Sequence, residues 1–146
     1  MQYIMKGDTL MIDYAGGEAL GQAFLAKETW AVVGVSANSE KFGYKVYKAL
    51  AEKWHVYPIN PKLTEIDGVH CFADLTDLPE TPDVVNIITP PAITLEIVKE
   101  CKVLGIKRVW MQPGAESADA IAYCRANQID VVFQSCAMVE AKNFKK

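Results

Sequence analysis

The sequence predicts an α/β fold in which an open, mostly parallel, doubly wound sheet of about five strands carries helices on both faces. Three observations predict it: apolar runs of strand length recur along the chain, segments with helical spacing separate them, and small residues or prolines follow the runs. A chain of 146 residues has the size of one ordinary domain. We therefore expect a single domain over residues 1–146, with its core over about residues 25–140.

The expected strands and helices alternate. A lead-in helix is expected over Glu18–Lys27, whereas residues 1–15 give a mixed pattern. The runs of strand length are Trp30–Val35, His55–Ile59, Val84–Thr89, Lys107–Met111 and Asp130–Phe133. Helical spacing covers Phe42–Ala51, Ile93–Leu104 and Ala118–Arg125. Gly105 and Asn127 follow the last two of these helices, as residues that can turn left-handed and end them.

The composition argues against several classes of protein. A formal net charge of −3 and a pI near 5.4 give no overall cationic field, so we expect neither a nucleic-acid nor a membrane partner. The apolar runs are too short to span a bilayer and no secretory pattern opens the chain, so we expect a cytoplasmic protein. The cysteines show no CxxC or zinc-site spacing, so we expect reduced thiols and no metal. A protein partner or a homo-oligomer stays open.

Ligands of doubly wound sheets bind beyond the carboxyl ends of the strands, near the point where the strand order reverses. We therefore expect the loops after the first four strands to share one rim. The candidate site residues are Gly34, Val35, Ser36, Ala37 and Lys41, then Asn60, Pro61 and Lys62, then Thr89, Pro90 and Pro91, and finally Gln112 and Gly114. A strand that turns through small residues into a helix presents backbone N–H groups to a phosphate. These residue types are also ordinary in turns, so their combination carries the prediction of a nucleotide-like ligand.

The first loop departs from the two common phosphate-binding motifs. In a dinucleotide fingerprint beginning at Gly34, Ser36 and Ser39 would replace the second and third glycines. Gly43 comes too late to serve, and a GK[ST] ending that would indicate a nucleoside triphosphate is absent. The second strand is not followed by the carboxylate that NAD-binding proteins place there. Lys62 offers a positive charge instead, which suits the ribose phosphate of NADP or of coenzyme A.

Three blocks of this sequence resemble a known family. They are Ala31–Ser36, Val56–Lys62 and Arg108–Gly114, and the Asn-Pro-Lys and Trp-Met-Gln-x-Gly portions are the most specific. Over about residues 25–140 the chain is similar to the stand-alone CoA-binding proteins of bacteria and archaea. It also resembles the N-terminal CoA-binding domain of the succinyl-CoA synthetase alpha subunit and of NDP-forming acyl-CoA synthetases. The resemblance implies a single Rossmann-like domain that binds coenzyme A or an acyl-CoA.

The resemblance also implies roles for the residues of the strand-end loops. It assigns the ADP diphosphate to Gly34, Ser36 and Ala37, the phosphates to Lys41 and Lys62, and the border of the adenine or the pantetheine arm to Thr89–Pro91. Stand-alone members often carry a phenylalanine and arginine pair after the third strand. The segment Ile88–Pro91 departs from that pattern and resembles the synthetase version of the loop.

The sequence shows no catalytic constellation. The synthetases use a phosphorylated histidine from a second domain, and we expect this chain to lack that domain. His55 and His70 do not follow a strand, and Cys136 has Glu140 nearby but no visible base to activate it. We therefore expect a CoA-binding module without catalysis of its own. The alternative is an NADP-dependent oxidoreductase or a fragment of one, and a third possibility is an interaction domain with a vestigial pocket.

Overall fold

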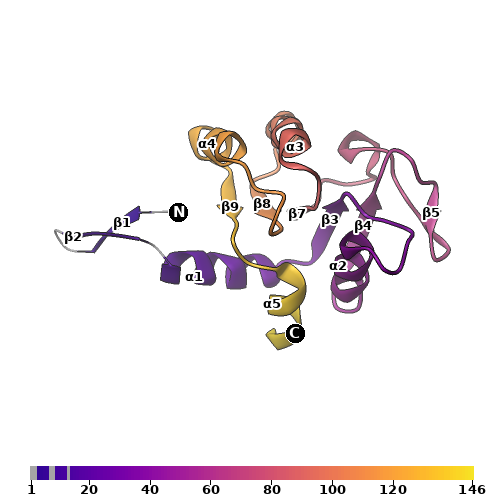
Figure 1. Ribbon diagram of the computed structural model, residues 1–146, viewed down its shortest axis with the longest axis horizontal. Coiled ribbons are helices and arrows are strands. Elements are labelled where there is room, and N and C mark those ends of the chain that lie inside the picture. Colours follow the sequence, from indigo (N-terminus) through magenta and orange to yellow (C-terminus); the bar gives the residue numbers. More distant parts are fainter. Residues whose placement is uncertain (1–2, 7–8, 13) are drawn as a thin grey trace.

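A five-stranded parallel sheet forms the centre of the computed structural model, which describes residues 3–6, 9–12 and 14–146 (Figure 1). The strands are β3 Thr29–Val33, β4 His55–Ile59, β7 Val84–Ile87, β8 Arg108–Met111 and β9 Asp130–Val132. They lie in the order β4-β3-β7-β8-β9, and every pairing is parallel. The chain runs from β3 outward to β4 and then crosses to β7 on the other side of β3. The strand order therefore reverses between β3 and β7.

Helices cover both faces of the sheet. They are α1 Tyr14–Leu25, α2 Phe42–Ala51, α3 Pro91–Leu104, α4 Ala118–Ala126 and α5 Ala137–Asn143. Helices α1, α2 and α5 share one buried cluster with Trp30, whereas α3 and α4 share another with Val85. Figure 1 shows these two sets on opposite sides of the strands. The predicted doubly wound, Rossmann-like α/β fold is confirmed.

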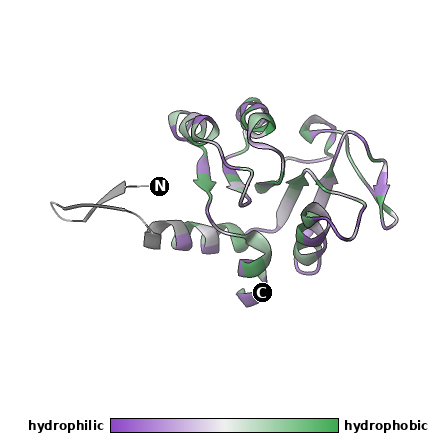
Figure 2. Cartoon of the chain, viewed as in Figure 1, coloured by the Kyte–Doolittle hydropathy of each residue, from purple (hydrophilic) through white to green (hydrophobic). Residues whose placement is uncertain are grey.

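Amphipathic helices and wholly buried strands account for this layered arrangement. All four residues of the central strand β7 are buried, as expected for a parallel strand covered on both faces. The covering helices α2, α3 and α4 carry both hydrophobic and hydrophilic residues (Figure 2), because one side faces the sheet and the other faces solvent. The Trp30 ring centroid lies 5.9 Å from that of Trp54 and 6.0 Å from that of Trp110, and this aromatic group fills the space between the sheet and α1, α2 and α5.

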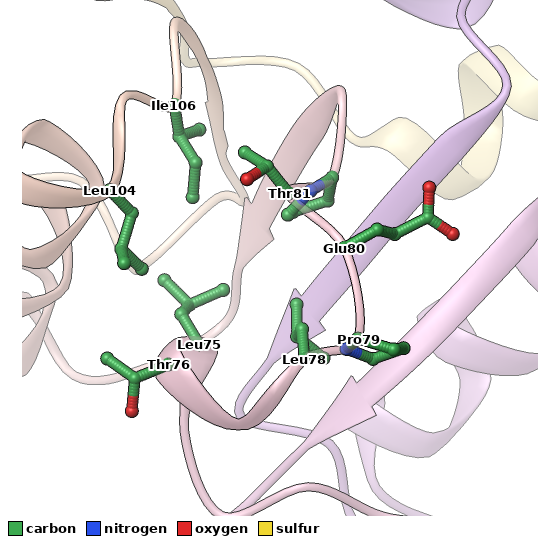
Figure 3. Close-up of a pocket in the computed structure, with 9 residues that line it drawn as sticks. Leu75, Thr76, Leu78, Pro79, Glu80, Thr81, Leu104 and Ile106 are labelled. Atoms are coloured by element: carbon green, nitrogen blue, oxygen red, sulfur yellow. The ribbon is translucent and has the colours of Figure 1, made fainter.

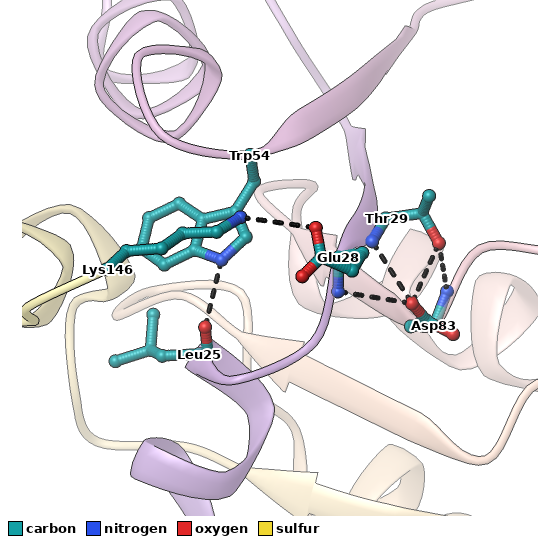
Figure 4. A network of polar contacts seen from close by, with 6 residues as sticks. All are labelled: Leu25, Glu28, Thr29, Trp54, Asp83 and Lys146. Atoms are coloured by element: carbon teal, nitrogen blue, oxygen red, sulfur yellow. Dashed lines mark hydrogen bonds and ion pairs between the residues drawn. The ribbon is translucent and has the colours of Figure 1, made fainter.

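A hydrogen-bonded network closes the amino edge of the sheet, where β3 and β7 begin (Figure 4). The Asp83 carboxylate accepts from the backbone N–H of Glu28 at 3.3 Å and of Thr29 at 3.1 Å, and from Oγ1 of Thr29 at 3.0 Å. Burial raises the pKa of Asp83, but these bonds and the nearby Arg108 lower it more, so the pKa lies below its usual value. Next to this network, Lys146 pairs with Glu28 at 3.6 Å.

The predicted strand ends differ from the observed ones by one or two residues. Strand β3 ends at Val33 rather than at Val35, because Gly34 turns the chain with a φ of 101°. Strand β7 likewise ends at Ile87 rather than at Thr89. The residues beyond each strand already belong to the loops that lead to α2 and α3.

The helix ends confirm one prediction and correct another. Gly105 ends α3 in the left-handed conformation, with a φ of 75°, as predicted. The prediction for Asn127 is wrong, because its φ is −115° and the left-handed residue is Gln128, at 56°. The side-chain Nδ2 of Asn127 bonds back to the carbonyl oxygen of Tyr123 at 2.9 Å.

Several helices and strands of the structure were not predicted from the sequence pattern. Helix α5, which was not predicted, is held by Lys53, whose Nζ donates to the carbonyl oxygens of Ala141 at 2.6 Å and Phe144 at 3.0 Å. Two short hairpins, β1 Tyr3–Lys6 with β2 Thr9–Ile12 and β5 Glu65–Ile66 with β6 Val69–His70, are antiparallel. Within the described residues, no helix is long and apolar enough to cross a membrane.

Candidate ligand-binding site

The loop that follows β3 turns sharply at Gly34. The Gly34 N–H donates to the carbonyl oxygen of Ile59 at 3.0 Å, which ties this turn to the end of β4. A Cβ at Gly34 would lie 3.1 Å from the backbone of Ile88 and 3.3 Å from Cγ2 of Thr89. Since φ is also 101°, both the space and the backbone favour glycine. The ends of β3, β4 and β7 therefore meet at this residue.

Helix α2 approaches the same turn through a second glycine. A Cβ at Gly43 would lie only 2.5 Å from the carbonyl oxygen of Gly34, so no other residue fits without movement of the helix. Close packing of helix on strand is the task of the third glycine in a dinucleotide fingerprint. Gly43 nevertheless stands too far from Gly34 in the sequence for that fingerprint, and it was not among the predicted site residues. A glycine inside a helical pattern was the signal that could have identified it.

Between these glycines, Val35 is buried in the core and Ser36 is half-buried, and residues 37–42 form an exposed loop with its own hydrogen bonds. Ser36 Oγ accepts from the N–H of Asn38 at 3.0 Å, and Asn38 Oδ1 accepts from the N–H of Glu40 at 3.0 Å. The N–H of Lys41 then bonds to the carbonyl oxygen of Asn38 at 3.0 Å, just before α2 begins. Because Ser36 Oγ acts as an acceptor, its own proton is still available as a donor. Ala37 is exposed in the same loop.

The loop after β4 is joined to the first loop by Asn60. Its Nδ2 donates to the carbonyl oxygen of Val35 at 2.7 Å, and its Oδ1 accepts from the N–H of Lys62 at 2.8 Å. Pro61 and Lys62 are exposed. Among the described residues, neither Lys41 nor Lys62 takes part in a salt bridge. Two uncompensated ammonium groups thus belong to the two connected loops.

The loop after β7 carries a pair of threonine hydroxyls. Thr89 Oγ1 lies 2.9 Å from Oγ1 of Thr94, which is fully buried in the first turn of α3. Pro90 and Pro91 are exposed beside them. Thr94 was not among the predicted site residues, because its place in an apolar helical pattern predicts packing alone. The structure shows that it fixes the hydroxyl of the candidate residue Thr89.

Helices α2 and α3 both begin without a side-chain cap. The residues before them, Lys41 and Pro90, make no capping hydrogen bond. Free N–H groups at a helix start attract anions, because they lie at the positive end of the helix dipole. By contrast, Ser117 caps α4, and its Oγ accepts from the N–H of Ala120 at 3.0 Å. Helices α2 and α3 thus begin uncapped in the two loops on either side of the strand-order reversal. The N-cap residue of α5, Cys136, also makes no side-chain cap, but there the N–H of Ala137 is bonded by Gln112.

The fourth predicted loop, after β8, is closed by its own side chains. Gln112 is fully buried, and its Oε1 accepts from Nδ2 of Asn86 at 3.0 Å and from the N–H of Ala137 at 2.8 Å. The N–H of Gly114 donates to Oε2 of Glu116 at 2.9 Å. The structure thus brings together the candidate residues after β3, β4 and β7. It places the Gln112 side chain inside the protein, against the start of α5.

A surface ion pair joins the β5–β6 hairpin to α2. Asp67 accepts from the Tyr44 hydroxyl at 2.6 Å and pairs with Lys48 at 3.0 Å. The bonds from Tyr44 and Lys48 hold the pKa of the Asp67 carboxyl below its usual value, and the same contact with Asp67 raises the pKa of Tyr44. Lys48 is therefore compensated, in contrast to Lys41 and Lys62.

The thiols and imidazoles do not assemble a reactive group. Cys71, Cys101 and Cys124 are buried, and burial raises the pKa of each thiol, that of Cys124 to about 12. Both histidines are exposed and pack edge-on against aromatic rings near β4. Among the described residues, no cluster of His, Cys, Asp and Glu could hold a metal ion.

A cavity of about 220 Å³ lies at the opposite end of the sheet (Figure 3). Leu75, Leu78, Leu104 and Ile106 provide its apolar walls, and Glu80 and Thr81 lie at its rim. The lining segments precede β7 and β8 and therefore belong to the amino edge of these strands. This cavity is separate from the candidate site.

The fold and the candidate site define a Rossmann-like domain whose loops after β3, β4 and β7 meet where the strand order reverses, at two uncapped helix starts. The chain belongs to the CoA-binding domain family, whose sequence profile matches residues 28–142. The resemblance seen in the sequence is thereby confirmed.

The relatives of this chain include much longer enzymes. An ADP-forming acetate–CoA ligase of Methanocaldococcus jannaschii is 33% identical over 78 residues, which cover 53% of this chain and 11% of that protein. The alpha subunit of ADP-forming acetate–CoA ligase II of Pyrococcus furiosus is 33% identical over 81 residues, 54% of this chain and 18% of that subunit. This chain therefore matches only a small part of these two relatives.

Solved structures of shorter or similar length share this fold over most of the chain. A hypothetical protein of Pyrococcus horikoshii OT3 superposes with a TM-score of 0.81 at 28% identity, covering 98% of each chain. A conserved hypothetical protein of Pyrococcus furiosus gives a TM-score of 0.74 at 36% identity, covering 77% of this chain and 98% of that one.

Proposed function

We propose that this domain binds coenzyme A or an acyl-CoA at the loops that follow β3, β4 and β7. The observation that carries the proposal is the meeting of these three loops at Gly34, between two uncapped helix starts. Membership of the CoA-binding domain family supports the choice of ligand. Coenzyme A carries a diphosphate and a separate ribose phosphate, which matches a site with more than one place for an anion.

Each loop has a part in this proposal. The turn at Gly34, with Val35, Ser36 and Ala37, receives the diphosphate at the start of α2. Lys41 and Lys62 supply positive charge, and Lys62 faces the ribose 3′-phosphate. Thr89, Pro90 and Pro91 border the adenine or the pantetheine arm at the start of α3. Asn60 supports the first two loops from within through its side-chain bonds, whereas Gln112 supports the end of β8 against the start of α5.

The domain acts in this proposal as a ligand-binding module without catalysis of its own. Its longer relatives are named acetate–CoA ligases, and this chain matches only 11% and 18% of two of them. A module of this kind would sense CoA or acyl-CoA in the cytoplasm, or present it to a separate protein or to a second copy of itself. The NADP-dependent alternative finds no support in the family comparison.

Calorimetric titration with CoA, acetyl-CoA, dephospho-CoA and NADPH tests the proposal. We expect saturable binding of CoA and no response to NADPH. Lys62→Ala should weaken CoA binding about tenfold more than dephospho-CoA binding, because the lysine is assigned to the phosphate that dephospho-CoA lacks. Lys107→Ala is the matched control, since Lys107 is an exposed lysine just before β8, at the opposite edge of the sheet.

The other outcomes of this titration are equally informative. Binding of NADPH alone would overturn the proposal in favour of an oxidoreductase domain. No response to any of the four compounds would favour a pure interaction domain. Equal weakening of CoA and dephospho-CoA binding by Lys62→Ala would remove the assignment of Lys62 to the 3′-phosphate.

A further inference from the structure

Every polar atom of Asn60 has a partner within the protein. The backbone N–H donates to the carbonyl oxygen of Phe72 at 2.9 Å, and the backbone oxygen accepts from the N–H of Leu63 at 3.2 Å. The side chain bonds to Val35 through Nδ2 and to Lys62 through Oδ1, at 2.7 and 2.8 Å. Asn60 is the point at which three separate chain segments join.

The orientation of the Asn60 amide is fixed by these two partners. A carbonyl oxygen can only accept, so the atom facing Val35 must be the NH₂ group. A backbone N–H can only donate, so the atom facing Lys62 must be the oxygen. The two bonds therefore leave along opposite ends of one planar amide. Neither end can be exchanged without loss of both bonds.

Pro61 accounts for the direction of the second bond. Proline has no N–H and restricts the residue before it to extended conformations, so Asn60 leaves β4 extended. The N–H of Lys62 is then the first donor that can turn back to the Asn60 side chain, as in turns initiated by asparagine. The backbone of Lys62 is thus placed by the asparagine two residues before it, while the Lys62 side chain stays exposed.

We propose that Asn60 is a positioning residue that holds Lys62 and the Gly34–Ser36 turn at a fixed separation, so that both engage one ligand with two anionic groups. The proposal rests on the proposed function and adds to it. Asn60 does not touch the ligand in this arrangement. It acts through the backbone of Val35 on one side and of Lys62 on the other. A ligand with both phosphate groups depends on the fixed separation, whereas a ligand with the diphosphate alone depends on it less.

The positioning of Lys62 by the Asn60 side chain can be tested without any ligand, by amide hydrogen exchange of the whole chain. In Asn60→Ala we expect the Lys62 amide to exchange about tenfold faster, because it loses its acceptor. Asn60→Asp keeps an oxygen acceptor and should retain slow exchange at Lys62 although the bond to Val35 is lost. Asn127→Ala is the matched control, since it removes an asparagine bond of 2.9 Å at the end of α4. An unchanged exchange rate of the Lys62 amide in Asn60→Ala would contradict the claim that the Asn60 side chain positions Lys62.

The effect on binding is measured by titrating CoA and dephospho-CoA into Asn60→Ala, Lys62→Ala and the double variant. We expect Asn60→Ala to lower the affinity for CoA about fivefold more than the affinity for dephospho-CoA. In the Lys62→Ala background the same substitution should no longer change this ratio. An equal loss for the two ligands would overturn the proposal, because a general loss of structure weakens both alike. If the wild type does not bind CoA, the proposed function fails. The exchange result still decides whether the Asn60 side chain positions Lys62.

Discussion

The two edges of the parallel sheet differ in whether their polar groups have partners within the protein. At the amino edge, Asp83 receives three hydrogen bonds from Glu28 and Thr29, so the starts of β3 and β7 are closed by the protein itself. At the carboxyl edge, α2 and α3 start without a cap, and Lys41 and Lys62 have no salt bridge among the described residues. Polar groups without protein partners are available to a ligand. The difference indicates which edge supports the fold and which edge is open to a ligand.

The start of α4 refines this comparison, because it lies at the carboxyl edge and is nevertheless closed. Ser117 caps the helix, and the Glu116 carboxylate accepts a hydrogen bond from the N–H of Gly114. Position at the carboxyl edge is therefore not sufficient for an open helix start. Helices α2 and α3, which begin uncapped, follow the loops on either side of the strand-order reversal, where ligands of such sheets bind.

The largest effect is expected at Gly43, where the open edge depends on close packing. Gly43→Ala places a Cβ 2.5 Å from the carbonyl oxygen of Gly34, so α2 must move away from the turn. We expect the free energy of unfolding to fall by about 3 kcal/mol and CoA binding to be lost. Urea denaturation measures the first effect and calorimetry the second. Gly21→Ala is the control, since its Cβ would meet only the Trp110 side chain, at 3.3 Å. Equal effects of the two substitutions would contradict the special role of Gly43.

Asp83→Asn tests the closed edge. The substitution weakens bonds to a charged acceptor and should cost about 2 kcal/mol of unfolding free energy at neutral pH, with no change in CoA affinity. Because the folded pKa of Asp83 is lowered, its stabilisation is present above the unfolded pKa of about 3.9 and is lost as the pH falls through the folded value. In denaturation experiments between pH 7 and pH 2, the free energy of unfolding should fall less in the variant than in the wild type. A pH dependence identical to that of the wild type would contradict this account.

Ser117→Ala removes the side-chain cap of α4, at the carboxyl edge of the sheet. Loss of the bond to the Ala120 N–H should lower the unfolding free energy by about 1 kcal/mol. CoA affinity should not change, because α4 lies outside the group of three loops. Thermal denaturation with and without CoA separates the two effects. A parallel loss of affinity would mean that the fourth loop belongs to the site after all.

Lys41→Ser supplies a cap where the protein has none. We expect a gain of about 0.5 kcal/mol in the unfolding free energy and weaker CoA binding, since the new hydroxyl competes with the ligand for the N–H groups of α2. Lys41→Ala is the matched control, because it removes the same charge without adding a cap. The two variants should therefore differ in stability. Equal stability would indicate that the start of α2 cannot be capped from position 41.

The sequence identified the strands, the loops and the fold class because these depend on local periodicity and turn residues. The Gly34 turn and the Asn60–Lys62 turn were located in this way. The close approach of Gly43 to Gly34 was missed, because it depends on how a helix packs against a distant strand end. Helix α5 was missed for a similar reason, since Lys53 and Gln112 hold it from other elements. The buried orientation of Gln112 likewise depends on Asn86 and Ala137, which are remote in sequence.

The burial of the thiols has a practical consequence for spectroscopy. Three of the four cysteines are buried and have raised pKa values, whereas Cys136 is partly exposed at the start of α5 and lies 3.3 Å from Nε2 of Gln112. A maleimide dye at neutral pH should therefore attach to one position of the native protein without removal of the other cysteines. Fluorescence from that position would report movement of α5 relative to the end of β8 in real time.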